Sequence, residues 1–299
     1  MFNDEKKVEI FKRHRPRLFG IAYRMLGTHA ESEDILQEAY IKWHQVESEA
    51  IETPEAWLVT VVTRLSIDRL RKASHERETY IGPWLPEPLV VSDAPSPEDE
   101  LELASNLSLA FMVLLERLSP IERAAFLLHD IFDCAYADIA RIVGKTETAS
   151  RQLIHRARER VRTDKPRFEA DEKEREKLIR KFSAASYAGD EKALLALFSD
   201  EILMISDGGG KVTAARKIIY GKEKLARLFS IGVAKYEKSF KQVPYTVNGE
   251  LGFLTLYDGK IFAATSFDIE DGKISAIYRV MNPDKLKAFD DLKENVPET

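Results

Sequence analysis

The sequence predicts a multidomain protein in which two all-α domains are followed by an α+β domain. Three observations support this fold class. Helical apolar periodicity runs through the first 165 residues, and a proline-rich segment interrupts it from Thr79 to Leu101. The last third carries three turn pairs that favour tight β-hairpins, namely Asn248-Gly249, Asp258-Gly259 and Asp271-Gly272. We therefore expect the last domain to be a curved antiparallel sheet with helices packed on one face.

Composition limits the classes of protein that the chain can belong to. Its 299 residues suffice for two or three hydrophobic cores. No apolar run reaches the roughly 18 residues of a membrane span, and the charged start Asn3 to Lys7 is no signal peptide, so we expect a cytoplasmic protein that contacts no membrane. The single Cys134 excludes an internal disulfide and a multi-cysteine metal site, and we expect neither a metal nor a cofactor. A net charge of −5 means that any DNA contact must come from local basic surfaces.

The first domain opens with three predicted helices. The first covers residues 5–26, with Pro16 as a kink or boundary and Gly27 as its end. Thr28 and Glu31 have the spacing of a capping box, ahead of a second helix over 33–44. Thr53-Pro54 starts the third helix, over 54–72. Its expected core side consists of Trp57, Leu58, Val61, Leu65 and Leu70.

The second of these helices carries a mostly polar stripe opposite its expected core side. The stripe has helical spacing and consists of Asp34, Gln37, Glu38 and Ile41. It is interpreted either as a solvated face or as a docking surface for a basic partner helix. The end of the third helix carries cations, Arg64, Arg71, Lys72 and His75, which either complement the helix dipole or contact DNA.

The stretch Tyr136 to Arg162 predicts a helix-turn-helix. Gly144 suits the turn, Thr146 can cap the second helix, and Ser119-Pro120 with Glu122 starts the helix before the motif. The expected apolar face consists of Ile139, Ala140, Val143, Leu153, Ile154, Ala157 and Val161, and the expected outer cations are Arg151, Arg156, Arg158, Arg160 and Arg162. The alternative is an ordinary αα-hairpin with a solvated basic face. The coincidence of turn glycine, cap and one-sided charge favours DNA binding.

The segments Asp34 to Trp43 and Ala56 to Arg71, followed by the helix-turn-helix, resemble an extracytoplasmic-function RNA polymerase sigma factor. The resemblance implies region two over residues 1–78, a proline-rich linker over 79–101 and region four over 102–165. It also implies two partners, which are promoter DNA and core RNA polymerase with its β subunit and β′ clamp helices. The stripe would dock on the clamp helices. The implied DNA-contacting residues are Arg64, Arg71, Lys72, Thr146, Thr148, Arg151, Gln152, His155, Arg156 and Arg158.

The last domain, over residues 166–299, resembles the SnoaL-like branch of the cone-shaped α+β fold. Three segments resemble the signatures of sigma factors with such an extension, namely Trp84-Leu-Pro-Glu-Pro88, Asp207-Gly-Gly-Gly-Lys211 and Asn282-Pro-Asp-Lys-Leu286. The extension is expected to modulate the sigma factor through contacts of an accessible glycine-rich turn with the linker or with region two. The expected regulatory interface consists of Trp84, Leu85, Pro86, Asp207, Gly208, Gly209, Gly210, Lys211, Asn282, Pro283 and Asp284.

Two other functions remain open for the chain. The last domain could catalyse an isomerisation or hydrolysis, and the side chains that would carry it are Asp207, Tyr245, Asp258, Asp268 and Arg279. Because the domain has no His or Cys, and turns explain several of its Asp residues, catalysis is not expected. The chain could instead be a helix-turn-helix regulator that senses a small molecule. Such a regulator would need no polymerase-docking stripe.

Overall fold

A computed structural model describes residues 4–46, 51–89, 108–162, 172–234 and 240–289. The chain divides into two compact units, one of residues 1–78, 91–107 and 111–165, the other of residues 79–90, 108–110 and 166–299. Parts of the predicted segments lie outside the described residues, among them 90–101 of the linker, 102–107 and 163–165 of region four, and 166–171 of the last domain. None of the described helices has the length and apolarity needed to cross a bilayer.

The first three helices of the chain pack together in the first unit. They are α1 (Asp4–Leu26), α2 (His29–Gln45) and α3 (Pro54–Glu78). Trp43 is fully buried, and its indole Nε1–H donates to the Lys7 carbonyl at 2.9 Å. Helix α1 ends before Gly27, which has a φ of 77°. It continues through Pro16, so of the two alternatives predicted there, a kink or a boundary, the boundary is wrong.

Two further expectations for these helices are corrected. The Thr28 hydroxyl donates to the Glu31 carboxylate at 2.8 Å and makes no cap hydrogen bond, so the predicted capping box is absent. In α3, Leu58 and Leu70 are buried as expected, whereas three residues predicted for the core are only partly buried, Trp57, Val61 and Leu65. The buried side instead includes Val59, Val62 and Ile67. Helix α3 carries apolar residues on more than one face, so the sequence pattern alone does not determine which face is buried. Packing against the neighbouring helices determines it.

The helix-turn-helix lies in the same unit. Helices α5 (Leu109–Leu115), α6 (Pro120–Asp130), α7 (Tyr136–Val143) and α8 (Glu147–Arg162) follow one another. The capping box at the start of α6 is confirmed, since the side chains of Ser119 and Glu122 each accept from the other's backbone N–H. Gly144 ends α7 with a φ of 67°, the left-handed conformation that glycine adopts without strain. Helix α8 packs on α6 and α7, with Ile154 and Ala157 buried.

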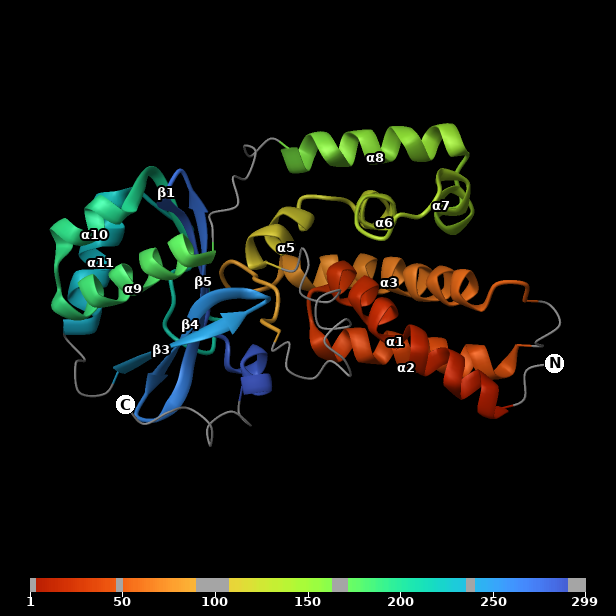
Figure 1. The fold of residues 1–299 in the computed structure, drawn as a ribbon, viewed down its shortest axis with the longest axis horizontal. Helices are drawn as coiled ribbons and strands as arrows, with labels where there is room; N and C mark the ends of the chain where they lie inside the picture. The colour runs from red at the N-terminus through yellow and green to blue at the C-terminus, as the bar shows by residue number, and fades with distance from the viewer. Residues whose placement is uncertain (1–3, 47–50, 90–107, 163–171, 235–239, 290–299) are drawn as a thin grey trace. The chain divides into compact units, whose positions relative to one another are not determined.

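The second unit consists of a six-stranded sheet with helices on one face (Figure 1). Helices α9 (Glu172–Ala188), α10 (Glu191–Leu197) and α11 (Lys222–Ala234) cover that face. The strands have the order β2-β1-β6-β5-β4-β3. Their bounds are β1 (Phe198–Asp207), β2 (Ile219–Tyr220), β3 (Phe240–Val247), β4 (Glu250–Tyr257), β5 (Lys260–Glu270) and β6 (Lys273–Val280).

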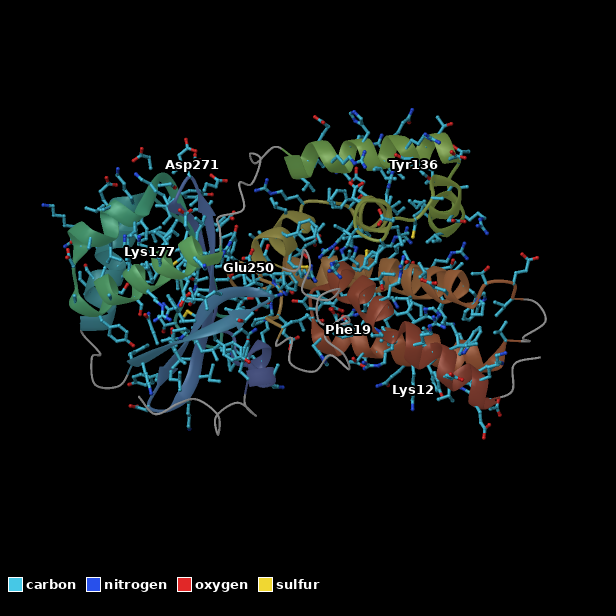
Figure 2. All side chains as sticks on the ribbon, viewed as in Figure 1. Lys12, Phe19, Tyr136, Lys177, Glu250 and Asp271 are labelled. Carbon is cyan, nitrogen blue, oxygen red and sulfur yellow. The ribbon has the colours of Figure 1, made fainter. Side chains whose placement is uncertain are left out.

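The expected sheet is confirmed except for one pair of strands. All three turn pairs connect antiparallel hairpins, and their first residues have positive φ angles of 52°, 48° and 50° at Asn248, Asp258 and Asp271. Figure 2 shows Asp271 at the tip of such a hairpin. Strands β1 and β6 pair in parallel, because the chain crosses the sheet between them. The core under the helices is aromatic, and Phe182 lies 5.9 Å from Phe253 between ring centroids.

Candidate nucleic-acid interface and linker clasp

Helix α8 presents a polar, basic surface to solvent. Thr146 caps it, since its hydroxyl oxygen accepts from the Ala149 N–H at 3.2 Å. The residues expected to contact DNA from this helix are all exposed, namely Thr146, Thr148, Arg151, Gln152, His155, Arg156 and Arg158. A capped helix with an exposed run of Arg and Gln has the side chains that phosphates and base edges recognise.

Acidic neighbours partly neutralise the cations of α8. Arg151 pairs with Glu147 at 2.6 Å and lies 4.2 Å from the Tyr136 ring centroid. Arg158 Nε donates to Asp130 Oδ2 at 2.8 Å, and this hydrogen bond is the main cause that raises the pKa of Arg158. Arg158 therefore ties α8 to α6, and a phosphate would have to displace Asp130 to bind it. Arg156 is 3.9 Å from Glu122 and more than half exposed, so it is better placed for DNA.

The cations on α3 differ in their contacts. Arg64 donates from Nε to the Ile142 carbonyl at 3.1 Å and from Nη2 to the Arg141 carbonyl at 2.7 Å. These carbonyls belong to the last turn of α7, so Arg64 caps the first helix of the helix-turn-helix. Arg71 pairs with Asp68 at 3.0 Å and is exposed, as is Lys72.

Other contacts join region two to region four in this unit. Arg17 Nη2 donates to the Phe132 carbonyl at 2.7 Å, and Arg123 Nε donates to the Arg24 carbonyl at 2.7 Å. Glu116 accepts from both Arg77 and Arg123. Burial acts to raise the pKa of Glu116, but the two guanidinium groups outweigh it and the net shift is downward. The two helical regions are thus held together by buried and half-buried arginines.

The stripe on α2 is exposed along its whole length. Asp34, Gln37 and Glu38 are solvent-exposed, and Ile41 has 54% of its surface exposed. Glu38 lies 3.3 Å from Lys42 in an exposed ion pair. The stripe is therefore accessible from solvent along one face of α2.

The glycine-rich turn and the linker meet at one buried carboxylate. Asp207 is fully buried at the end of β1. Its Oδ1 accepts from the Tyr80 hydroxyl at 2.5 Å, and its Oδ2 accepts from the Leu85 N–H at 2.9 Å and from Lys285 Nζ at 2.7 Å. Asn282 joins this set because its Nδ2 donates to the Tyr80 oxygen at 2.9 Å. We call the five residues the linker clasp, namely Tyr80, Leu85, Asp207, Asn282 and Lys285. The Gly209 N–H also donates to Asp207 Oδ1, at 3.0 Å, so the carboxylate is satisfied by three neutral donors and one cation.

Aromatic and proline residues complete the clasp. The ammonium of Lys285 lies 4.1 Å from the Trp84 ring centroid and also donates to the Leu85 carbonyl. Leu85 is fully buried and Pro86 is buried. Burial raises the pKa of Tyr80, and the hydrogen bond to Asp207 raises it further, so the hydroxyl stays protonated and continues to donate.

Steric constraints explain why the turn after β1 contains glycines. Gly209 and Gly210 have φ angles of 58° and 71°, and a Cβ on Gly210 would come within 2.8 Å of Ile81 Cδ1. The expectation that the turn is accessible is wrong for its first residues, since Asp207 and Gly208 are buried and only Gly210 and Lys211 are exposed. Lys211 pairs with Asp284, and Pro283 starts the short 3-10 helix η3 (Pro283–Lys285).

Several residues of this site were not among those predicted from the sequence. Tyr80 and Lys285 are central to the clasp. A second hold lies further along the linker, where the Leu89 N–H donates to Asn248 Oδ1 at 3.0 Å and the Asn248 N–H donates to the Leu89 carbonyl at 3.2 Å. Lys285 lies inside the segment Asn282 to Leu286 and Tyr80 lies just before Trp84 to Pro88, so their positions could have indicated the clasp. Asn248 was already explained by its place in a hairpin turn.

The side chains considered for catalysis do not converge. Register places Arg279 on the helix-covered face of the sheet with Ile277, whereas Tyr245 and Asp268 alternate onto the opposite face. Asp258 lies in a hairpin turn and Asp207 belongs to the clasp. Among the described residues, no group of His, Cys, Asp and Glu is placed to hold a metal ion.

A helix-turn-helix packed on further helices, in a chain that also contains a separate sheet domain, defines a modular DNA-binding transcription protein. The family model described as Sigma-70 region 2 matches residues 10–76, and the model described as Sigma-70, region 4 matches residues 108–161. The chain is 37% identical to the ECF RNA polymerase sigma factor SigJ of Mycobacterium tuberculosis, over 94% of this chain and 93% of that protein.

Two further comparisons extend this similarity over nearly the whole chain. The probable ECF RNA polymerase sigma factor SigI of Mycobacterium tuberculosis is 28% identical, over 92% of this chain and 93% of that protein. The crystal structure of Mycobacterium tuberculosis SigJ aligns with a TM-score of 0.76 at 34% identity, over 94% of this chain and 98% of that chain. The chain therefore belongs to the extracytoplasmic-function sigma factors of RNA polymerase. It is a transcription initiation factor, not an enzyme, and it acts with core polymerase and promoter DNA.

Proposed function

We propose that the C-terminal domain of this sigma factor modulates transcription initiation by holding the linker between regions two and four. The observation that carries the proposal is the buried carboxylate of Asp207, which accepts hydrogen bonds from Tyr80, Leu85 and Lys285. Helix α3 ends at Glu78, and the clasped segment follows it directly. When residues 80–89 are held on the C-terminal domain, fewer linker residues are free to span the distance between the two DNA-binding regions.

We also propose how the polymerase and DNA surfaces are divided. The α2 stripe of Asp34, Gln37, Glu38 and Ile41 binds the clamp helices of the polymerase β′ subunit. The exposed surface of α8 binds the upstream promoter element as duplex DNA. Arg64, Arg71 and Lys72 on α3 contact the downstream element. Since core polymerase and promoters are found in the bacterial cytoplasm, the protein acts there.

The contacts of Arg64 support a closed resting arrangement of the two helical regions. The guanidinium cannot cap α7 and grip a phosphate with the same donors at the same time. Promoter binding through α3 therefore competes with the closed arrangement. Release of the clasped linker would lower the cost of separating regions two and four, because more chain becomes available to connect them.

In vitro transcription with purified core polymerase tests this function. The full-length protein would be compared with Trp84→Ala and Asp207→Asn, and Asp258→Asn serves as a matched control because Asp258 is an exposed turn carboxylate. We expect the two clasp variants to change the yield of promoter-specific transcript by severalfold and the control to match the parent. Equal yields from all four proteins would refute the regulatory role. A parent that gives no specific transcript would refute the assigned promoter and polymerase contacts.

A further inference from the structure

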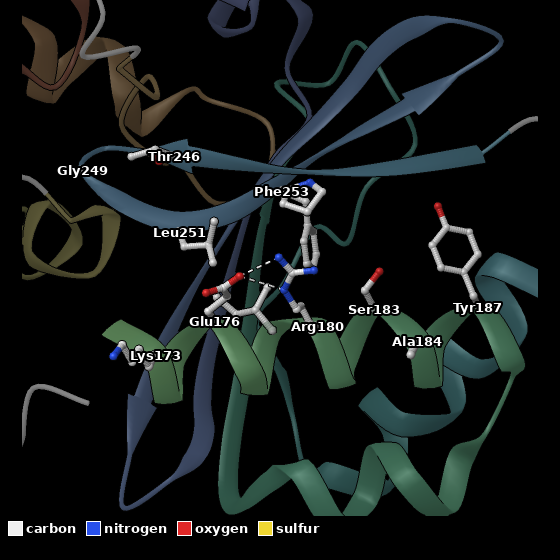
Figure 3. Close-up of a pocket in the computed structure, with 12 residues that line it drawn as sticks. Lys173, Glu176, Arg180, Ser183, Ala184, Tyr187, Thr246, Gly249, Leu251 and Phe253 are labelled. Atoms are coloured by element: carbon white, nitrogen blue, oxygen red, sulfur yellow. Dashed lines mark hydrogen bonds and ion pairs between the residues drawn. The ribbon is translucent and has the colours of Figure 1, made fainter. Parts of the chain in front are cut away.

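A cavity of about 720 Å³ lies in the C-terminal domain between helix α9 and the β3–β4 hairpin (Figure 3). Its size is within the range of sites that enclose small organic ligands, roughly 300–1,000 Å³. The floor is apolar and fixed, since Ile179 and Phe253 are buried members of the domain core. Pro244, Ala184 and Leu251 extend the apolar lining. Such a surface is suited to the hydrocarbon or ring part of a ligand.

The rim of the cavity carries several hydrogen-bond donors and one carboxylate, Glu176. Arg180 uses Nε and Nη2 on a single oxygen of Glu176, at 2.9 and 2.6 Å, which leaves Nη1 uncommitted among the described residues. Tyr187 accepts from the Gln242 N–H, so its own hydroxyl hydrogen remains available. Lys173 adds a second cation against the one carboxylate of Glu176. Figure 3 shows Arg180 and Tyr187 extending from α9 toward the strands. A net positive rim with spare donors selects an anionic, acceptor-rich group.

The opposite wall of the cavity is the hairpin that holds the linker. Thr246, Gly249 and Leu251 line it. Asn248 lies between them, and it bonds both backbone groups of Leu89, accepting the N–H with its side-chain Oδ1 and donating its own N–H to the carbonyl. A ligand that fills the cavity contacts this hairpin directly. Ordering the hairpin then strengthens the hold of Asn248 on Leu89, because a bound ligand reduces local opening of the segment that it touches.

We propose that this cavity binds a small amphipathic monoanion, with an apolar body on Ile179 and Phe253 and an anionic group at Arg180, and that its occupancy tightens the grip on the linker. The consequence for transcription rests on the proposed function of the clasp, whereas the binding site does not. The site makes the C-terminal domain a sensor whose ligand is recognised by charge and apolar bulk together.

Calorimetric titration of the full-length protein tests the binding. The probes are decanoate, decanol and decyltrimethylammonium, which share one alkyl chain and differ in charge, and acetate, which has the charge without the chain. We expect decanoate to bind more tightly than the other three. Arg180→Gln should weaken decanoate about tenfold, the worth of one charge-assisted hydrogen bond, and leave decanol unchanged. Ala184→Trp should abolish binding by filling the cavity.

Lys177→Gln is the matched control, because Lys177 is an exposed cation of α9 that does not line the cavity. The three substituted side chains are all exposed, and melting temperatures equal to that of the parent would show that each variant folds. Decanoate affinity no greater than that of decyltrimethylammonium, or unchanged by Arg180→Gln, would overturn the proposed site.

Hydrogen exchange at the Leu89 amide tests the coupling. Saturating decanoate should slow this exchange severalfold in the parent and leave it unchanged in Ala184→Trp. Unchanged exchange in the saturated parent would overturn the coupling of cavity to linker. Slowed exchange together with normal transcription by Trp84→Ala would support the ligand site and refute the regulatory role of the clasp. Failure of the ligand proposal can therefore be distinguished from failure of the proposed function.

Discussion

The backbone N–H of Leu85 donates to Asp207 Oδ2 at 2.9 Å, although 122 positions separate the two residues in the chain. The linker around Leu85 contains Pro83, Pro86 and Pro88, whose fixed φ angles keep it extended before it docks. Less conformational entropy is therefore lost when the clasp closes than for a flexible linker. The buried carboxylate is the point at which this contact can best be tested.

Asp207→Asn should destabilise the C-terminal domain by about 3 kcal/mol, because it leaves the buried ammonium of Lys285 without its counter-charge. Urea unfolding of the full-length protein measures this change. The double variant Asp207→Asn with Lys285→Met should recover part of the loss, since no unpaired charge then remains. A single Asn variant as stable as the parent would show that the ion pair contributes nothing.

The sequence predicted local structure of this domain better than its long-range contacts. Asn248-Gly249 and the two Asp-Gly pairs determine hairpins through their own backbone preferences, and all three were confirmed. The parallel pairing of β1 with β6 has no comparable local signal. The burial of Asp207 depends on Lys285 and on a linker far away in sequence, so a turn that looked accessible is largely covered.

The helical regions show the same limit. Capping residues such as Ser119 and Glu122 determine a helix start within four positions, and that start was predicted correctly. Arg64 was assigned to DNA from its place at a helix end, but the carbonyls that it contacts lie 77 and 78 positions away. No periodicity in α3 could indicate that contact, because it depends on how region four packs on region two.

Glu116→Gln should destabilise the first unit at neutral pH and much less in acid. The pKa of Glu116 is lowered from its ordinary value of 4.5, with burial opposed and outweighed by Arg123 and Arg77. Its stabilising contribution is therefore complete above about pH 4.5 and is lost as the pH falls through the lowered folded-state pKa. Urea unfolding at pH 7 and near pH 3 should show the difference between parent and variant shrinking.

Glu33→Gln provides the comparison for that experiment. Glu33 forms an exposed ion pair with Arg15 at 2.7 Å, and exposed pairs contribute only about 0–1 kcal/mol. Its substitution should change the unfolding free energy little at either pH. If Glu116→Gln behaved like Glu33→Gln, the buried arginine contacts would not hold regions two and four together.

Arg64→Met should loosen the closed arrangement of the two helical regions. The variant leaves the Ile142 and Arg141 carbonyls without their guanidinium donors, so amide exchange in the last turn of α7 should accelerate severalfold. Arg71→Met is the control, since Arg71 pairs only with the exposed Asp68 among the contacts described here. Equal exchange in both variants would exclude a role for Arg64 in closing the arrangement.

Ile41→Ala should weaken binding to core polymerase about tenfold, the usual effect of truncating an apolar anchor at an interface. The side chain is exposed, so the fold should tolerate the change. Asp34→Lys should weaken binding further by placing a cation against a basic partner helix. Gln45→Ala, at the end of the same helix, is the control, and fluorescence anisotropy with labelled protein gives the affinities. Equal affinity of Ile41→Ala, Asp34→Lys and Gln45→Ala would remove the stripe from the polymerase interface.

Arg156→Gln and Gln152→Ala should separate phosphate contacts from base readout on α8. Arg156 is exposed and pairs weakly with Glu122, so its loss should reduce binding to all DNA sequences and lower the salt-dependence slope by about 1. Gln152→Ala should leave that slope unchanged and relax preference at one base pair by about 1–3 kcal/mol.

The salt slope and the base preference are both measured with reconstituted holoenzyme on promoter and random duplexes over a range of salt concentrations. Lys181→Gln, an exposed cation in the C-terminal domain, should change neither quantity. An unchanged salt slope for Arg156→Gln would place the phosphate contacts elsewhere on α8, and unchanged base preference for Gln152→Ala would assign readout to its neighbours Thr148 and His155.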